Sequence, residues 1–167
     1  MKKYLVGYFC LINLIYSCQT KPKINNDLVY SALNGILLQD SIFAMIVCSK
    51  FEQVLIPRAI EKEFFPNEGS FIRSQQKRAE NISIDTGRLY FYWPRKHQLA
   101  KSFIDTTCSK GILYRLSYPI FSRNLQTVVI EITEDCNCML GGWGVKAVYK
   151  RYGDKWVKVK EFDRWIS

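Results

Sequence analysis

Alternation of apolar and polar residues in the C-terminal third limits most strongly what this chain can fold into. Residues 126–133 alternate cleanly, as a strand with one buried face requires. Two further segments of strand character, residues 145–151 and 155–162, flank the tripeptide Tyr-Gly-Asp at 152–154. Gly-Asp between two such segments is a strong hairpin signal. The pattern predicts an antiparallel sheet whose last two strands form a hairpin, with Val145, Ala147, Tyr149, Val157 and Val159 facing the core.

Helical spacing appears earlier in the chain. Apolar residues recur at helical intervals over residues 28–37, after the capping residues 25–27. A shorter helix is expected within residues 67–81. The apolar run 42–48 fits either a buried strand or a second helix. With further strands at 89–93 and 112–116, we expect an α+β fold: N-terminal helices, then a mainly antiparallel sheet of about four or five strands. A length of 167 residues suits one globular domain, placed at residues 27–167.

The first 26 residues have the pattern of an export signal and a tether. Residues 1–17 combine a Met-Lys-Lys start with an apolar stretch too short to span a bilayer. Residues 14–18 resemble a bacterial lipobox, in which the cysteine, here Cys18, is acylated and becomes the first mature residue. Residues 18–26 are polar and form the tether. We therefore expect a lipoprotein carrying palmitate or a similar acyl chain, anchored in the bacterial cell envelope and facing the periplasm.

Basic residues are interleaved with an aromatic residue on one predicted face of the hairpin: Lys146, Lys150, Trp156, Lys158 and Lys160. The chain carries a net charge of +9, and such a face suits an anionic glycan or lipid. The alternative is a solvated face whose lysines discourage edge pairing. Because an exported protein rarely meets nucleic acid, we expect an envelope protein, glycan or lipid as partner and no nucleic acid.

Trp143 stands among three glycines, Gly141, Gly142 and Gly144. Glycines permit tight turns or the close approach of a ligand to the backbone. Two interpretations follow: a ligand contact at Trp143, or a loop between two strands in which Trp143 covers the core.

Four cysteines remain after the signal peptide and Cys18: Cys48, Cys108, Cys136 and Cys138. In an exported chain they favour disulfides, although sequence does not choose among the three pairings. We favour Cys108 bonded to Cys136 or Cys138, with Cys48 as a buried thiol. The alternative is zinc bound by Cys136 and Cys138 with Cys108, His97 or Cys48. Their spacing matches no strong zinc pattern, so no metal and no cofactor are expected.

Catalytic signals are weak. Cys108 and His97 are the best candidates for a nucleophile and its base, but no recognised catalytic motif accompanies them. The acidic residues are scattered, and neighbours such as Glu134 and Asp135 should not face a common point on a strand. We therefore expect a non-enzymatic binding or interaction module; the alternative is a small cysteine- or metal-dependent hydrolase of the envelope.

Several motifs of the chain form a recognisable set. They are Ser117-x-Pro119-Ile120-Phe121-Ser122, a cysteine pair with glycines, Gly153-Asp154-Lys155-Trp156, the segment 164–167 and Glu68-x-x-Phe71-Ile72-x-x-Gln75. Together they cover residues 68–80 and 112–167 and resemble small lipoproteins from Bacteroidetes-type bacteria, a group without an assigned activity. The resemblance implies an envelope lipoprotein and carries no catalytic residues to this chain.

Overall fold

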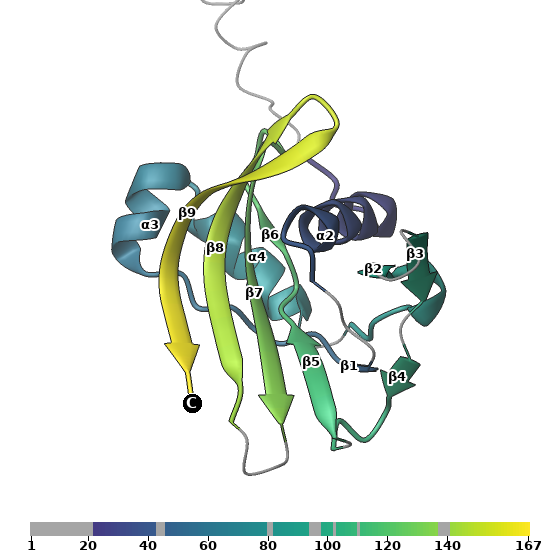
Figure 1. Cartoon of the computed structure of the whole chain (residues 1–167). Coiled ribbons are helices and arrows are strands. Elements are labelled where there is room, and N and C mark those ends of the chain that lie inside the picture. The colour runs from purple at the N-terminus through teal and green to yellow at the C-terminus, as the bar shows by residue number, and fades with distance from the viewer. Residues whose placement is uncertain are drawn as a thin grey trace, which may run out of the picture.

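A mixed sheet forms the centre of the molecule (Figure 1). The computed structural model describes residues 22–42, 46–79, 82–93, 98–101, 103–109, 111–136 and 141–167. The strands of the sheet are β1 (Ile46–Cys48), β4 (Phe103–Asp105), β5 (Ile112–Leu116), β6 (Ile120–Phe121), β7 (Thr127–Cys136), β8 (Trp143–Tyr152) and β9 (Lys155–Ile166). Their order is β4-β1-β5-β7-β8-β9, with β6 also paired to β7, and a separate two-stranded sheet joins β2 (Tyr90–Trp93) to β3 (Gln98–Lys101).

The α+β class predicted from the sequence is confirmed, but the arrangement differs in two ways. Within the described residues the main sheet has seven strands and is mixed, because β1 runs parallel to both β4 and β5. The helices do not all precede the sheet, since β1 lies between α2 (Asn26–Gln39) and the pair α3 (Arg58–Phe64) and α4 (Gly69–Ala79). Residues 46–48 of the apolar run therefore form a strand, and α3 arises in a segment where no helix was expected.

Helix α2 forms where the spacing predicts it. Asn25 caps it, its side chain accepting a hydrogen bond from the backbone N–H of Leu28, which satisfies one of the free donors of the first turn. One stripe of the helix is fully buried against the sheet. Gly35 permits this close packing, because a Cβ there would lie 2.9 Å from Cδ1 of the buried Trp156.

The β8–β9 hairpin forms as expected, with its turn at Gly153. However, β9 carries two irregularities: Phe162 and Val159 are extra residues relative to β8. Each β-bulge shifts the alternation of β9 by one residue. Between the turn and the first bulge, however, the register already pairs Trp156 with Arg151, Val157 with Lys150 and Lys158 with Tyr149. Trp156 therefore shares the face of Tyr149 and is buried, with 3% of its surface exposed, whereas Val157 (37%) and Val159 (38%) are exposed. The prediction that these two valines face the core is wrong for this reason.

The sheet thus has two distinct faces near the hairpin. We call the side packed against α2 the α2 face; it carries Tyr149 and Lys158, which both bond Asp40 after the end of α2. The opposite side is the α3 face; there Lys160 bonds Glu63 of α3. In Figure 1, α3 lies beside β9 while α2 lies on the other side, near β2.

Helix α4 covers the free edge of β6. The buried amide of Gln75 donates to the carbonyl oxygen of Phe121 at 2.8 Å and accepts from its N–H at 2.8 Å. This side chain replaces a neighbouring strand, because it satisfies both backbone groups that the edge would otherwise leave unpaired.

Residues 1–21, which hold the predicted signal peptide and Cys18, lie outside the described residues. Among the residues that are described, none of the helices is both long and apolar enough to cross a membrane.

Candidate functional site

A cavity of about 520 Å³ lies between the C-terminal end of α2 and the α2 face of β7, β8 and β9. The wall includes the apolar side chains of Trp143 and Val145. Four charged side chains also line it: Asp40, Glu134, Lys158 and Arg164. This cavity is an open cleft that holds a few polar groups, and its volume is that of a small-molecule site, about 300–1,000 Å³.

Glu134, on β7, is held by two neutral donors. Both the phenol of Tyr114 and the indole N–H of Trp143, at 3.0 Å, donate to its Oε2. Burial, together with the Glu134 carboxylate, raises the pKa of the Tyr114 phenol far above its ordinary value, so Tyr114 remains a donor. Among the described residues no hydrogen bond reaches Oε1 of Glu134. That oxygen can accept a hydrogen bond from a ligand.

Asp40 is held in a similar way at the other side of the cavity. Its Oδ2 accepts from the Tyr149 phenol at 2.5 Å and from Nζ of Lys158 at 2.6 Å. Burial, and then Asp40 itself, raises the pKa of Tyr149 well above its ordinary value. A carboxylate at the C-terminal end of a helix is unfavourable beside the negative end of the helix dipole. The lysine and the phenol offset that cost, and they fix Asp40 in place with 12% of its side chain exposed.

The two cations of the cavity are already paired. Lys158 bonds Asp40, and it lies 4.0 Å from Glu161. Arg164 makes two hydrogen bonds to Glu161, at 2.5 and 2.8 Å. Glu134 differs from both acids, because its two partners are neutral.

Two of the residues expected at a ligand site, Trp143 and Lys158, line the cavity. Trp143 begins β8 directly opposite Glu134. The preceding Gly142 is required there, since a Cβ would lie 2.3 Å from the carbonyl oxygen of Glu134. The close approach at Gly142 is therefore made by strand β7, and the ligand contact expected at Trp143 stays a prediction.

The expected basic face is not formed. The register at the turn places Trp156 and Lys158 on the α2 face, and the bulge at Val159 moves Lys160 to the α3 face. On that face Lys160 bonds Glu63 at 2.5 Å, and both Lys150 and Lys160 lie over the ring of Phe64. Lys146 is bound by Asp163 at 2.8 Å and lies 3.6 Å from Glu131. The lysines are therefore distributed over two faces and mostly neutralised.

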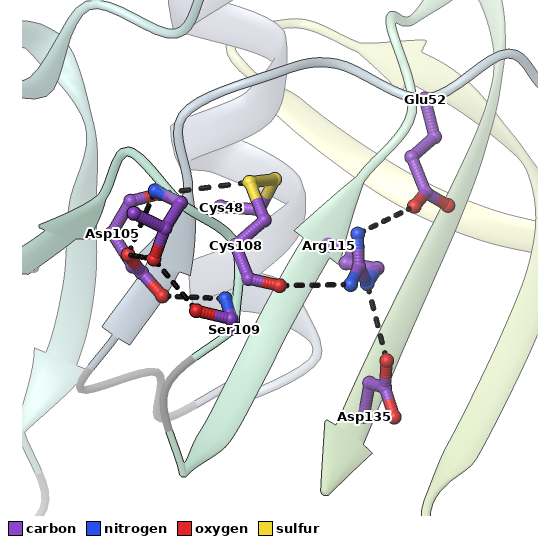
Figure 2. The surroundings of a disulfide bond; sticks show 8 residues. Cys48, Glu52, Asp105, Cys108, Ser109, Arg115 and Asp135 are labelled. Atoms are coloured by element: carbon purple, nitrogen blue, oxygen red, sulfur yellow. Dashed lines mark hydrogen bonds and ion pairs between the residues drawn. A yellow bond between two sulfur atoms is a disulfide. The ribbon is translucent and has the colours of Figure 1, made fainter. Parts of the chain in front are cut away.

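A disulfide joins Cys48, the last residue of β1, to Cys108 in the loop after β4 (Figure 2). The two cysteines are 60 residues apart in the chain. The expected disulfide at Cys108 is present, but the expected pairing is wrong, as is the expectation that Cys48 is a free thiol. The parallel pairing of β1 with β4 sets Cys48 opposite Asp105, three residues before Cys108, which brings the two sulfur atoms together.

Arg115 joins the disulfide loop to the sheet (Figure 2). Its guanidinium group donates to Glu52 and to Asp135, each at 3.3 Å, and to the carbonyl oxygen of Cys108 at 3.2 Å. These groups border a smaller cavity of about 290 Å³, which includes Cys48, Cys108 and Arg115 in its lining. Because Arg115 already bonds these acids, the second cavity presents few charged groups that a ligand could pair with.

The remaining candidates are affected by the disulfide or lie outside the described residues. Cys108 has no free thiol, so it is neither the nucleophile nor the zinc ligand that the sequence suggested. Cys136 is disulfide-bonded as well. His97, Cys138 and Cys18 lie outside the described residues, and within the described part no cluster of three metal-ligating side chains occurs.

No protein-family model, curated protein or solved structure matches this chain. The resemblance to small lipoproteins therefore remains an expectation from the motifs, and the geometry of the site carries the functional argument.

Sequence reasoning missed Asp40, which lines the cavity, and gave Tyr114 and Tyr149 no role in holding the two carboxylates. Glu134 was noticed only as one of a pair. The expectation that Glu134 and Asp135 point apart agrees with the structure, since only Glu134 lines the large cavity and only Asp135 bonds Arg115. Tyr114 and Tyr149, each on a predicted strand, could have indicated the two carboxylates, because a buried phenol needs a hydrogen-bond acceptor.

Proposed function

We propose that this protein is an exported, lipid-anchored protein of the bacterial cell envelope that acts as a non-enzymatic binding module, with the 520 Å³ cavity as its binding site. The observation that carries the binding part is the pair of oriented carboxylates. Glu134 and Asp40 are each fixed through one oxygen by a tyrosine, and the other oxygen has no hydrogen bond among the described residues. Fixed acceptors in a preformed cavity favour binding, because little ordering is needed when the ligand enters.

Two observations support the envelope part. Residues 1–18 have the pattern of a lipoprotein signal with Cys18 at the acylation position. The Cys48–Cys108 disulfide agrees with folding in an oxidising compartment such as the periplasm. Two or more acyl chains on Cys18 would anchor the protein stably.

The hydrolase alternative is not favoured by the geometry. Its nucleophile was Cys108, whose sulfur is bonded to Cys48. The cavity instead presents carboxylates held by protonated tyrosines.

Metabolic labelling with radioactive palmitate tests the anchor. The full chain should incorporate label and sediment with membranes, and Cys18→Ala should abolish both. Cys10→Ala is the matched control and should be labelled like the unchanged protein, because Cys10 leaves with the signal peptide. Equal labelling of the Cys18→Ala variant would refute the anchor.

Native mass spectrometry of the full chain in detergent tests the binding site. After incubation with the low-molecular-weight fraction of an envelope extract, we expect a bound adduct. Trp143→Ala should reduce the adduct, because this change removes the wall of the cavity next to Glu134. The matched control is Asp135→Ala, which alters the neighbouring residue on the opposite face and should retain the adduct. Absence of any adduct from the unchanged protein, or equal loss in both variants, would overturn the proposed site.

A further inference from the structure

The charges around the cavity do not balance. Lys158 is paired with Asp40, and Arg164 with Glu161. Glu134 remains, and both of its partners are neutral. No residue in the described part of the chain forms an ion pair with Glu134. A half-buried carboxylate without a cation is stabilised when a cation reaches it.

We propose that the cavity binds a small primary amine, with its ammonium group on Oε1 of Glu134. This inference rests on the proposed function, because it identifies the ligand of the same site. An ammonium group supplies both the missing positive charge and an N–H donor for Oε1. Charge-assisted hydrogen bonds of this kind are stronger than neutral ones.

The surroundings of Glu134 fit an ammonium group better than a neutral or anionic one. Trp143 donates its indole N–H to Oε2, so its ring lies directly beside the carboxylate. The ring of Tyr114 meets that of Trp143 edge to face, with centroids 6.3 Å apart. Both aromatic partners of the carboxylate are uncharged, so no cation bonded to Glu134 among the described residues opposes an ammonium group there. The second acceptor, Oδ1 of Asp40, lines the same cavity and can take a further N–H or O–H.

The rest of the cavity determines the body of the ligand. Ile42, Val145 and Ile166 add apolar wall, so a short hydrocarbon body is favoured over a highly charged one. A volume of about 520 Å³ accommodates a complete small molecule. A primary amine is favoured over a quaternary one, because only N–H groups satisfy Oε1 of Glu134.

Three probes that differ only at the head group test this assignment: propylammonium, 1-propanol and propyltrimethylammonium. Binding to the full chain in detergent is measured by saturation-transfer NMR titration, with empty micelles as the blank. We expect propylammonium to bind about tenfold or more tightly than the other two probes, because they cannot form the charge-assisted hydrogen bond to Glu134. Equal binding of 1-propanol would overturn the ammonium assignment, and equal binding of propyltrimethylammonium would overturn the requirement for N–H donors.

Variants locate the contact. Glu134→Gln keeps an oxygen that can accept from Tyr114 and Trp143 but removes the charge, and it should weaken propylammonium binding about tenfold. The matched control Asp135→Asn should change the affinity less than about twofold, because Asp135 lies on the opposite face and bonds Arg115. An unchanged affinity in Glu134→Gln would refute the inference.

The outcomes separate the two proposals. If propylammonium fails to bind while the envelope adduct is present and sensitive to Trp143→Ala, the ligand class is wrong and the binding module stands. If neither the adduct nor the probe is found, both are refuted.

Discussion

Adjacent residues of β7 show how the two faces of the sheet use the same chemistry differently. Glu134 lies on the α2 face, where its partners are a phenol and an indole. Asp135 lies on the opposite face, where its partner is the guanidinium group of Arg115. In an ion pair the negative charge of the carboxylate is neutralised by the cation. Neutral donors orient the carboxylate but leave its negative charge uncompensated, so that it can attract a cation. The ion pair of Asp135 therefore contributes to stability, whereas the neutral partners of Glu134 suit a binding site.

The contrast holds for Glu134, which has only neutral partners among the described residues, and for the ion pairs of the α3 face, although the α2 face also holds the pairs Lys158–Asp40 and Arg164–Glu161. On the α3 face Lys146 binds Asp163 at 2.8 Å and lies 3.6 Å from Glu131; burial raises the pKa of Glu131, while Lys146 opposes that rise. On the α2 face buried phenols contact the carboxylates, and their pKa values are raised. Substitutions on the α3 face, which we also call the ion-paired side, should therefore mainly change stability. Substitutions on the α2 face, the cavity side, should mainly change binding.

The largest effect should come from the disulfide that ties the ion-paired side together. Replacing both Cys48 and Cys108 by Ala opens a crosslink between residues 60 positions apart, and we expect the free energy of unfolding to fall by about 4 kcal/mol. Urea denaturation of the unchanged protein and of the double variant measures this difference. Binding of the amine probe should persist in the folded variant. Loss of binding with intact folding would show that the two regions are coupled.

A smaller effect should follow from removing the ion-pair centre itself. Arg115, with 26% of its side chain exposed, bonds two acids and a carbonyl oxygen, and Arg115→Ala should cost about 2 kcal/mol of unfolding free energy. Arg151→Ala is the control, because Arg151 forms an exposed pair with Asp154 at 3.6 Å and should change stability by less than about 1 kcal/mol. Equal losses of unfolding free energy in both variants would argue against a stabilising role of the Arg115 contacts.

Local sequence signals were enough to predict the hairpin, the capped helix α2 and the presence of a disulfide. Each depends on residues that are near one another in the chain or on the compartment. The cavity could not be predicted, because its contacts join distant segments. The Tyr149–Asp40 hydrogen bond, for example, spans 109 residues.

The pairing register at the turn and the bulges of β9 together explain the largest error, the assignment of residues to the two faces of the hairpin. Phe162 and Val159 are ordinary strand residues, and nothing in the local sequence marks them as extra. A strict period of two therefore placed Lys158 beside Lys160, although they lie on opposite faces. The cysteine pairing failed similarly, because β1 has three residues and its parallel partners are not visible in the sequence.

Packing of α2 against the sheet gives a third test, on the cavity side. Gly35→Ala should gain about 1 kcal/mol in helix propensity but force Trp156 to move, since the new Cβ would lie 2.9 Å from its ring. Because overpacking a core costs about 1–3 kcal/mol, we expect a net loss of about 1 kcal/mol. Thermal unfolding measures it, with Ser31→Ala on the exposed side of α2 as control. A stabilised Gly35→Ala variant would show that Trp156 yields without cost.

A last effect should appear at alkaline pH, and it distinguishes the phenols beside the cavity from the ion pairs on the α3 face. Burial raises the pKa of Tyr114 and Tyr149 in the folded chain above the ordinary 10.0. A tyrosine with a raised folded pKa contributes stability that is complete below about pH 10. This stability is lost as the pH rises from there through the folded pKa, because the unfolded chain releases its protons first. We therefore expect the free energy of unfolding to fall steeply above pH 10.

The double variant Tyr114→Phe and Tyr149→Phe should lose about 1 kcal/mol per phenol near neutral pH through the missing hydrogen bonds, yet its stability should fall less steeply above pH 10. Tyr152→Phe, at an exposed position in the hairpin, should retain the slope of the unchanged protein. If the double variant kept that slope as well, the alkaline loss would belong to the lysines of the ion-paired side, and the phenols would not be the groups that hold their protons in the fold.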